Sequence, residues 1–264
     1  MPAPEPANEL LDLLDLEELD TNLYRAGNPP EPQTNHLFGG QVAAQALRAA
    51  ADTVPLDRRP HSLHGYFLRG GSPGRSTILT VDRDRDGRSF SARHVNAIQD
   101  GEVIFSMLAS FHVGEDGADH QLEPMPTGVP DPDALEGPEH QGINAMLDVR
   151  YPAARDAGAW GARRLWARPR APMPDDGVTP ACVLTYLSDL GWAFAEVPGF
   201  EAGGGPSLDH AVWFHRPATV NQWLLLDLEA TTIAGARGVF RGTVHDREGR
   251  LLASLAQEAL LRKK

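Results

Sequence analysis

Cysteine is nearly absent from the chain, which has 264 residues and a single cysteine, Cys182. One thiol cannot form a disulfide within the chain, and the lack of disulfides is typical of a reducing compartment. No apolar run approaches the roughly 20 residues that a transmembrane helix needs. The first eight residues contain neither a basic segment nor an apolar stretch, which argues against a secretory signal. These absences predict a cytoplasmic protein that does not span a membrane.

Basic residues are also scarce. Lys and Arg number 24 against 36 Asp and Glu, so the formal net charge is −12. An acidic surface repels phosphate backbones and anionic headgroups, which excludes nucleic acid and the membrane surface as expected partners.

Motifs for metals, phosphates and catalytic nucleophiles are missing too. No Gly-rich phosphate-binding fingerprint occurs, and no second His or Cys cluster accompanies His210 and His215 at a metal-ligand spacing. In a strand, Asp209 and His210 would point to opposite faces. The string Gly70-Gly71-Ser72-Pro73-Gly74 fits a nucleophile elbow, but it leads into a strand rather than a helix, so it predicts a turn. No metal or redox cofactor is expected.

The patterns that are present predict an α+β fold. Helices are expected over residues 8–19, 37–54 and 179–190, and the second of these has a surface of small residues. Strands are expected over residues 61–68, 76–82, 89–97 and 102–113, and again over 145–151, 160–167, 207–216, 223–231, 238–244 and 251–261. The acidic, Pro-rich residues 114–144 between the two sets resemble a linker.

The two halves repeat one another. Tyr66-Phe67-Leu68-Arg69 matches Trp213-Phe214-His215-Arg216, and Val103-Ile104-Phe105-Ser106 matches Leu251-Leu252-Ala253-Ser254 in the same order. A repeat of this kind indicates a duplicated domain. We therefore expect an N-terminal unit over residues 1–113, a linker over 114–144 and a C-terminal unit over 145–264. The two units should pack as a pseudo-dimer with a site between them.

Gln257 is out of place in the last strand. Five of the six alternate positions from Leu251 to Leu261 are apolar, so this face should be buried, and Gln257 interrupts it. The matched residue of the first half is Ala109, so the fold itself does not require an amide there. Two interpretations stay open: a structural amide bonded to a neighbouring strand, or a group kept for function.

Asp189 and Ser207 raise the same question. Asp189 lies in the last turn of an apolar helix, next to the negative end of the helix dipole, which is unfavourable by about 0.3–1 kcal/mol. It could point to solvent, or its cost could be retained for function. Ser207 follows a Gly-rich turn and, taken alone, is an ordinary turn residue.

Six segments carry a resemblance to a known family. They are LFGGQVAAQAL, HSLHGYFLR, RDGRSFSARHVNAIQDGEVIFSMLASF, SLDHAVWFHRP, ARGVFRG and LLASLAQEALLR. In family order, and over nearly the whole chain, they resemble the acyl-CoA thioesterase II family. The resemblance implies a double hotdog, which is two tandem hotdog units, each an antiparallel sheet wrapped round a long helix.

The resemblance also implies a site and a reaction. Asp189, Ser207 and Gln257 correspond to the residues that activate and hold a water for hydrolysis of acyl-CoA thioesters, without a cofactor. An oligomer, dimer or higher, is implied as well. Residues 199–205 are short and Gly-rich and depart from the family pattern. Two alternatives stay open: another hotdog enzyme of acyl thioesters, such as a hydratase or dehydratase that pairs an acid with a His, or a non-catalytic acyl-CoA-binding protein.

Overall fold

The computed structural model describes residues 9–29, 35–137, 145–152, 162–191, 193–194, 197 and 205–262. Its helices are α1 (Glu9–Leu14), α2 (Gly39–Ala51) and α3 (Thr179–Ser188), with a short 3-10 turn η1 (Pro132–Ala134). Its strands are β1 (Glu17–Asp20), β2 (Leu23–Ala26), β3 (Arg58–Phe67), β4 (Thr77–Asp86), β5 (Phe90–Gln99), β6 (Glu102–Val113), β7 (Leu147–Arg150), β8 (Ala162–Pro169), β9 (Asp209–Phe214), β10 (Leu224–Ala234), β11 (Arg237–His245) and β12 (Leu251–Leu260).

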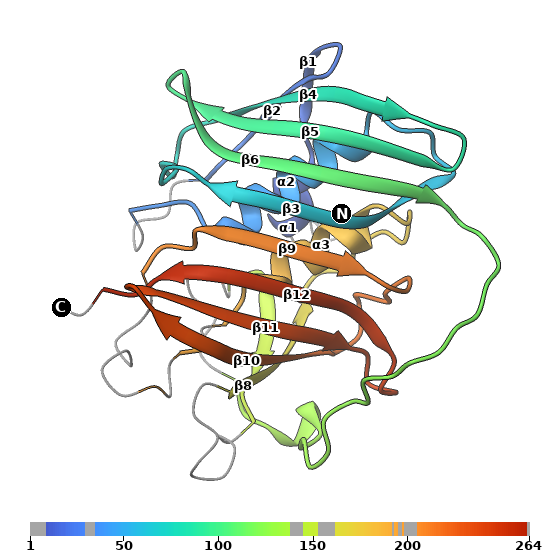
Figure 1. Ribbon diagram of the computed structural model, residues 1–264, viewed down its shortest axis with the longest axis vertical. Coiled ribbons are helices and arrows are strands. Elements are labelled where there is room, and N and C mark those ends of the chain that lie inside the picture. The colour runs from blue at the N-terminus through green and yellow to red at the C-terminus, as the bar shows by residue number, and fades with distance from the viewer. Residues whose placement is uncertain are drawn as a thin grey trace, which may run out of the picture.

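The strands form one antiparallel sheet in the order β1-β2-β4-β5-β6-β3-β9-β12-β11-β10-β8-β7. Each half of the chain supplies one half of the sheet, and the halves join where β3 pairs with β9 (Figure 1). The sheet curves round α2 and α3, so the predicted α+β architecture is confirmed. None of the helices in the described ranges is long and apolar enough to cross a membrane.

The first predicted helix was too long. It ends at Leu14, and Glu17–Asp20 form β1 instead, paired with β2, a strand that the sequence patterns did not reveal. Leu10, Leu13 and Leu14 are the buried residues of the helix, whereas the four residues of β1 are all exposed. The proposed N-cap, Asn8, lies outside the described residues. The domain boundaries near residues 113 and 145 stay a prediction.

The sheet registers agree with the sequence repeat. Tyr66 stands opposite Ser106 in the first half, and its match Trp213 stands opposite Ser254 in the second. At the junction of β3 and β9, His64 pairs with Ala211. Tyr66–Asp209 and Ser62–Trp213 lie on either side of that pair at equal separations. A pseudo-two-fold axis therefore passes through the His64–Ala211 pair.

Small residues allow the two long helices to lie close together. A Cβ on Gly40 would come within 2.6 Å of the Tyr186 carbonyl oxygen, so α2 and α3 touch at this point through the backbone. Every residue of α3 is buried, as its sequence, apolar nearly all round, predicts. This close contact brings the start of α2 beside the end of α3.

The segment between the halves is anchored rather than loose over residues 114–137. Met125, Val129 and Leu135 pack against a cluster of Trp166 on β8, Trp223 just before β10 and Leu225 on β10. The indole nitrogen of Trp166 donates to the Pro130 carbonyl at 3.0 Å. The predicted linker thus covers part of the outer face of the second half-sheet.

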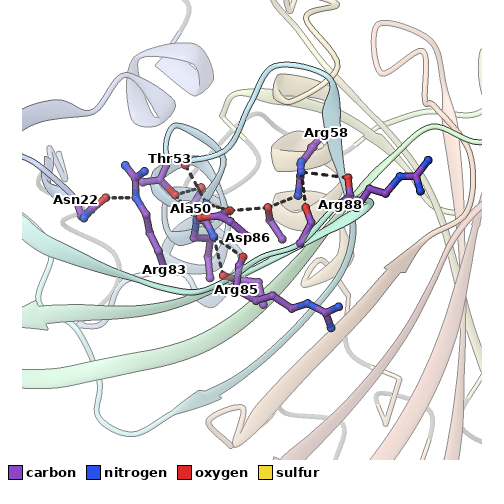
Figure 2. A network of polar contacts seen from close by, with 12 residues as sticks. Asn22, Ala50, Thr53, Arg58, Arg83, Arg85, Asp86 and Arg88 are labelled. Carbon is purple, nitrogen blue, oxygen red and sulfur yellow. Dashed lines mark hydrogen bonds and ion pairs between the residues drawn. The ribbon is translucent and has the colours of Figure 1, made fainter.

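A buried arginine ties α2 to the first half-sheet. Arg93 on β5 is 1% exposed, and its guanidinium donates to Thr53 Oγ1 at 2.7 Å and to Asp86 Oδ1 at 2.6 Å. Figure 2 shows this network round Asp86 and Thr53, just beyond the end of α2. Such an ion pair, bonded to further carbonyls, satisfies a charge that would otherwise be costly to bury.

Candidate active site

The carboxylate of Asp189 lies between the two helices. Asp189 is the C-cap of α3, but its Oδ2 accepts the backbone N–H of Gly40 at 2.8 Å. Gly40 belongs to the first turn of α2, whose dipole is positive at that end and favours a negative charge. The unfavourable placement at the end of α3 is therefore compensated by the start of α2. Asp189 does not point freely into solvent.

Gln257 connects Asp189 to Ser207. Its amide nitrogen Nε2 donates to Asp189 Oδ1 at 3.0 Å and to Ser207 Oγ at 2.6 Å. Gln257 lies on β12 and is 4% exposed, as the interrupted apolar face predicts. Ser207 precedes β9 and bridges to Ala259 on the neighbouring strand. The structure thus brings the three predicted site residues together, and their catalytic role stays a prediction.

Two glycines leave room for this cluster. A Cβ on Gly39 would come within 2.8 Å of Asp189 Oδ2 and 2.9 Å of the Phe67 ring. Any larger residue at position 39 would therefore displace the carboxylate or the ring. The Gly-Gly pair before α2 serves the site as well as helix packing.

Burial is the main influence on the acidity of Asp189. It raises the pKa of the Asp189 carboxyl above its usual range, and the neighbouring His210 and the donors Gln257 and Gly40 reduce the rise. Burial likewise lowers the pKa of His210, which favours a neutral imidazole. A carboxylate with a raised pKa is a stronger proton acceptor than an exposed one.

His210 is a site residue that sequence reasoning did not assign. It is 1% exposed, and it is the largest electrostatic influence on Asp189. Asp209 does point the other way, as strand alternation requires, because it accepts the Glu258 N–H at 2.7 Å. One signal could have found His210: the sequence repeat matches it to Leu63, which shows that the fold itself accepts a leucine there.

The hydrogen bonds limit the proton positions of this cluster. Both amide hydrogens of Gln257 are used by Asp189 and Ser207, so its Oε1, a buried acceptor without another partner, needs a donor. Within this cluster, His210 Nδ1 is also a buried atom without a partner, and the side chains of His210 and Gln257 lie close enough to interact. His210 Nε2 is 2.7 Å from Ser188 Oγ. The Ser188 hydroxyl has one hydrogen and two neighbouring acceptors, the Thr185 carbonyl at 2.8 Å and His210 Nε2. In the tautomer whose Nε2 accepts that hydrogen, the imidazole proton is on Nδ1 and is available to Gln257 Oε1.

Metal ligands are not gathered here. Within the described ranges, no group of three or more His, Cys, Asp and Glu side chains is placed to hold a metal ion. The Gly-rich residues 199–204 that depart from the family pattern lie outside those ranges.

Known proteins resemble the chain over nearly its full length. The model of the acyl-CoA thioesterase N-terminal domain matches residues 28–112, and that of the C-terminal domain matches residues 119–261. The acyl-CoA thioesterase 2 of Haemophilus influenzae is 33% identical over 279 residues, covering 97% of each chain.

Solved structures agree with these matches. The crystal structure of the acyl-CoA thioesterase II TesB2 from Mycobacterium marinum is 39% identical, with a TM-score of 0.84, covering 97% of this chain and 98% of that one. A conserved protein of unknown function with a hot dog fold from Alicyclobacillus acidocaldarius is 21% identical, with a TM-score of 0.83 over 97% of this chain and 98% of that one, and it supports the fold alone. The chain therefore belongs to the acyl-CoA thioesterase II family, and its architecture is the double hotdog.

Proposed function

We propose that the chain hydrolyses acyl-CoA thioesters to free fatty acid and CoA, with a water activated by Asp189 and held by Ser207 and Gln257. The observation that carries the proposal is the hydrogen-bonded cluster of these three side chains at the junction of the two halves. Its members come from α3, from the segment before β9 and from β12, and an ordinary core needs none of them. The family relationship supports the same reaction.

Each group has a part in the proposed chemistry. The Asp189 carboxylate, with its raised pKa, takes a proton from the water as the water attacks the thioester carbon. Ser207 accepts a hydrogen bond from Gln257 and keeps its own hydroxyl proton to orient the water. The first-turn N–H groups of α2 beside Gly40 are placed to stabilise the developing oxyanion. The start of α3 is already capped by Asp176, which accepts the Thr179 N–H at 2.6 Å.

The rival reactions differ in what they require of His210. A hydratase or dehydratase needs an imidazole that reaches the substrate, whereas His210 is buried and its Nε2 is occupied by Ser188. His210 instead fits a supporting role, in which its Nδ1–H holds the Gln257 carbonyl so that the amide faces Asp189 and Ser207.

We place the reaction in fatty acid metabolism in the cytoplasm, which the single, buried Cys182 supports.

The reaction is tested with a series of acyl-CoA thioesters of different chain length, by measuring the free thiol released. Asp189→Asn should lower turnover about 10²–10⁴-fold, the usual contribution of a general base. Gln257→Ala should also slow turnover without loss of folding, and the double variant should lose less than the sum of the two losses in activation free energy. Asp52→Asn, at the C-cap of α2, is the matched control. Near-normal turnover of Asp189→Asn, or hydration of an enoyl-CoA without thiol release, would contradict the proposal.

The raised pKa of Asp189 also predicts a pH dependence of stability. Because the folded state favours the protonated carboxyl, the charged form costs free energy at about pH 7, and this cost disappears as the pH falls through the raised pKa towards the ordinary value of about 4. Asp189→Asn removes the cost, since the neutral amide carries no charge to desolvate. The variant should melt at a higher temperature than wild type near neutral pH, with a difference that shrinks on acidification. A difference that grows on acidification would show that the sign is wrong.

The supporting role of His210 is tested by two substitutions. His210→Leu places the residue of the first half, Leu63, in the second, and should lower kcat about tenfold to a hundredfold with little change in KM, because Gln257 loses a buried partner. His210→Asn keeps a donor where Nδ1 stood, so it should recover most of the loss. His215→Asn, directly after the same strand, is the control and should retain turnover. Equal losses in His210→Asn and His210→Leu would instead indicate that the imidazole transfers protons.

We propose in addition that the chain assembles into a dimer or a higher oligomer. Tyr66, Leu108 and Trp213 are 62%, 49% and 38% exposed on adjacent strands of the outer sheet face, and large exposed apolar side chains that lie together mark contact sites. Light scattering at micromolar concentration should give a multiple of the chain mass of 28.6 kDa. Leu108→Lys should reduce that mass. A wild-type monomer under these conditions would refute the assembly.

A further inference from the structure

The pseudo-two-fold axis assigns a counterpart to each group of the active site. Asp52 is the C-cap of α2, as Asp189 is of α3. On the strands, Ala109 matches Gln257, Pro60 matches Ser207 and Leu63 matches His210, in the register that pairs Tyr66 with Ser106 and Trp213 with Ser254. The fold therefore contains a second place with matched strand positions, at the other end of the two helices.

The reactive groups are missing from that second place. Alanine, proline and leucine supply no amide, hydroxyl or imidazole, and Asp52 is paired with Arg48 of its own helix at 3.0 Å. The buried guanidinium of Arg93, which stands opposite Ala109 across β5 and β6, binds Thr53 just beyond the end of α2. Water activation is therefore not expected there.

A cleft is nevertheless present. A cavity of about 390 Å³ lies between the start of α3, the start of β3 and the end of β9, with apolar side chains from Pro60, Ala181, Leu184 and Phe214. Phe214 is the repeat counterpart of Phe67, whose ring lies beside Gly39 and Asp189 in the active site. The volume is within the usual range of small-ligand pockets, about 300–1,000 Å³.

The rim of this second cleft supplies one cation without a counter-ion. The Arg59 guanidinium donates to the Leu56 carbonyl at 3.1 Å, and no carboxylate pairs with it in the described part of the chain. The other rim cation, Arg216, is paired with Asp119. The rim imidazoles His61 and His215 each lie within 3 Å of a serine hydroxyl, at 2.7 and 2.9 Å.

Two carboxylates also lie at the rim, those of Glu115 and Asp175. Glu115 lies 3.3 Å from His112 Nε2, and Asp175 lines the cleft near Gly177. An apolar floor with a guanidinium at its mouth fits a molecule with an alkyl chain and an anionic end.

We propose that this second cleft is a non-catalytic site for a fatty carboxylate, with the alkyl chain over Ala181, Leu184 and Phe214 and the carboxylate on Arg59. The choice of ligand rests on the proposed function, since a fatty acid is its product. The location rests on the cleft itself and on the repeat. The chain would thus hold two molecules of the same class, one at the reactive cluster and one at its inert counterpart.

Calorimetric titration with decanoate tests the second cleft. Wild type should bind two molecules per chain. Ala218→Trp, which fills the cleft wall, should bind one and hydrolyse decanoyl-CoA within about twofold of wild type. Arg59→Ala should weaken one of the two sites about 10- to 100-fold, the contribution of a hydrogen bond to a charged group. Arg88→Ala, which removes the same charge outside the cleft, should leave both sites unchanged.

The outcomes separate this inference from the hydrolysis. A single site in wild type, or a stoichiometry that neither Ala218→Trp nor Arg59→Ala alters, would overturn the second site. Because Arg59 is exposed, its variant keeps the test valid if the tryptophan disturbs folding. If wild type bound two molecules of decanoate and these variants bound one, the second site would be upheld. If wild type also failed to hydrolyse decanoyl-CoA, the proposed reaction alone would be refuted.

Discussion

The hydrogen bond from the Gly40 N–H to the Asp189 carboxylate joins the two halves of the molecule at their functional centre. It uses the positive end of one helix to hold a charge that the negative end of the other would repel. The bond requires α2 and α3 to lie close together, which the glycines at positions 39 and 40 permit. The small-residue surface of α2, the buried surface of α3 and the antiparallel junction of β3 with β9 all serve this one approach.

Duplication of the hotdog unit creates two such places, and the side chains make them different. One carries Asp189, Gln257 and His210, which are costly to bury and satisfy one another. The other carries Ala109 and Leu63 at matched positions and is filled in part by Arg93. A buried polar group costs about 1–3 kcal/mol when its partner is missing, so a half-complete cluster would be the least stable arrangement. A complete cluster on one side and an apolar or internally paired one on the other avoids that cost.

Much of the fold was predictable because long periodic segments report burial directly. The α2 helix, the strands β3 to β6 and β9 to β12, and the positions of Gln257 and Asp189 all follow from apolar patterns and from their interruptions. Other features depend on tertiary contacts that no local pattern encodes. Residues 17–20 form a strand because β2 is beside them, and Met125 and Leu135 hold the linker because Trp166 and Trp223 lie beneath. The role of His210 was not predicted, because the alternation of side chains along a strand shows which face a residue lies on but not which residues lie beside it.

The comparison of the halves is also an argument about which groups the fold requires. Where both halves carry the same residue type, as at Phe67 and Phe214, packing alone explains it. Where one half carries a polar side chain and the other an apolar one, the backbone tolerates both. The polar group is then required by the contacts of its own half and not by the fold. Gln257 opposite Phe240 and Ala109 opposite Arg93 show this most clearly, because the register is the same and the chemistry is not. Within a duplicated fold, each half thus serves as the internal reference that separates what the architecture needs from what the site needs.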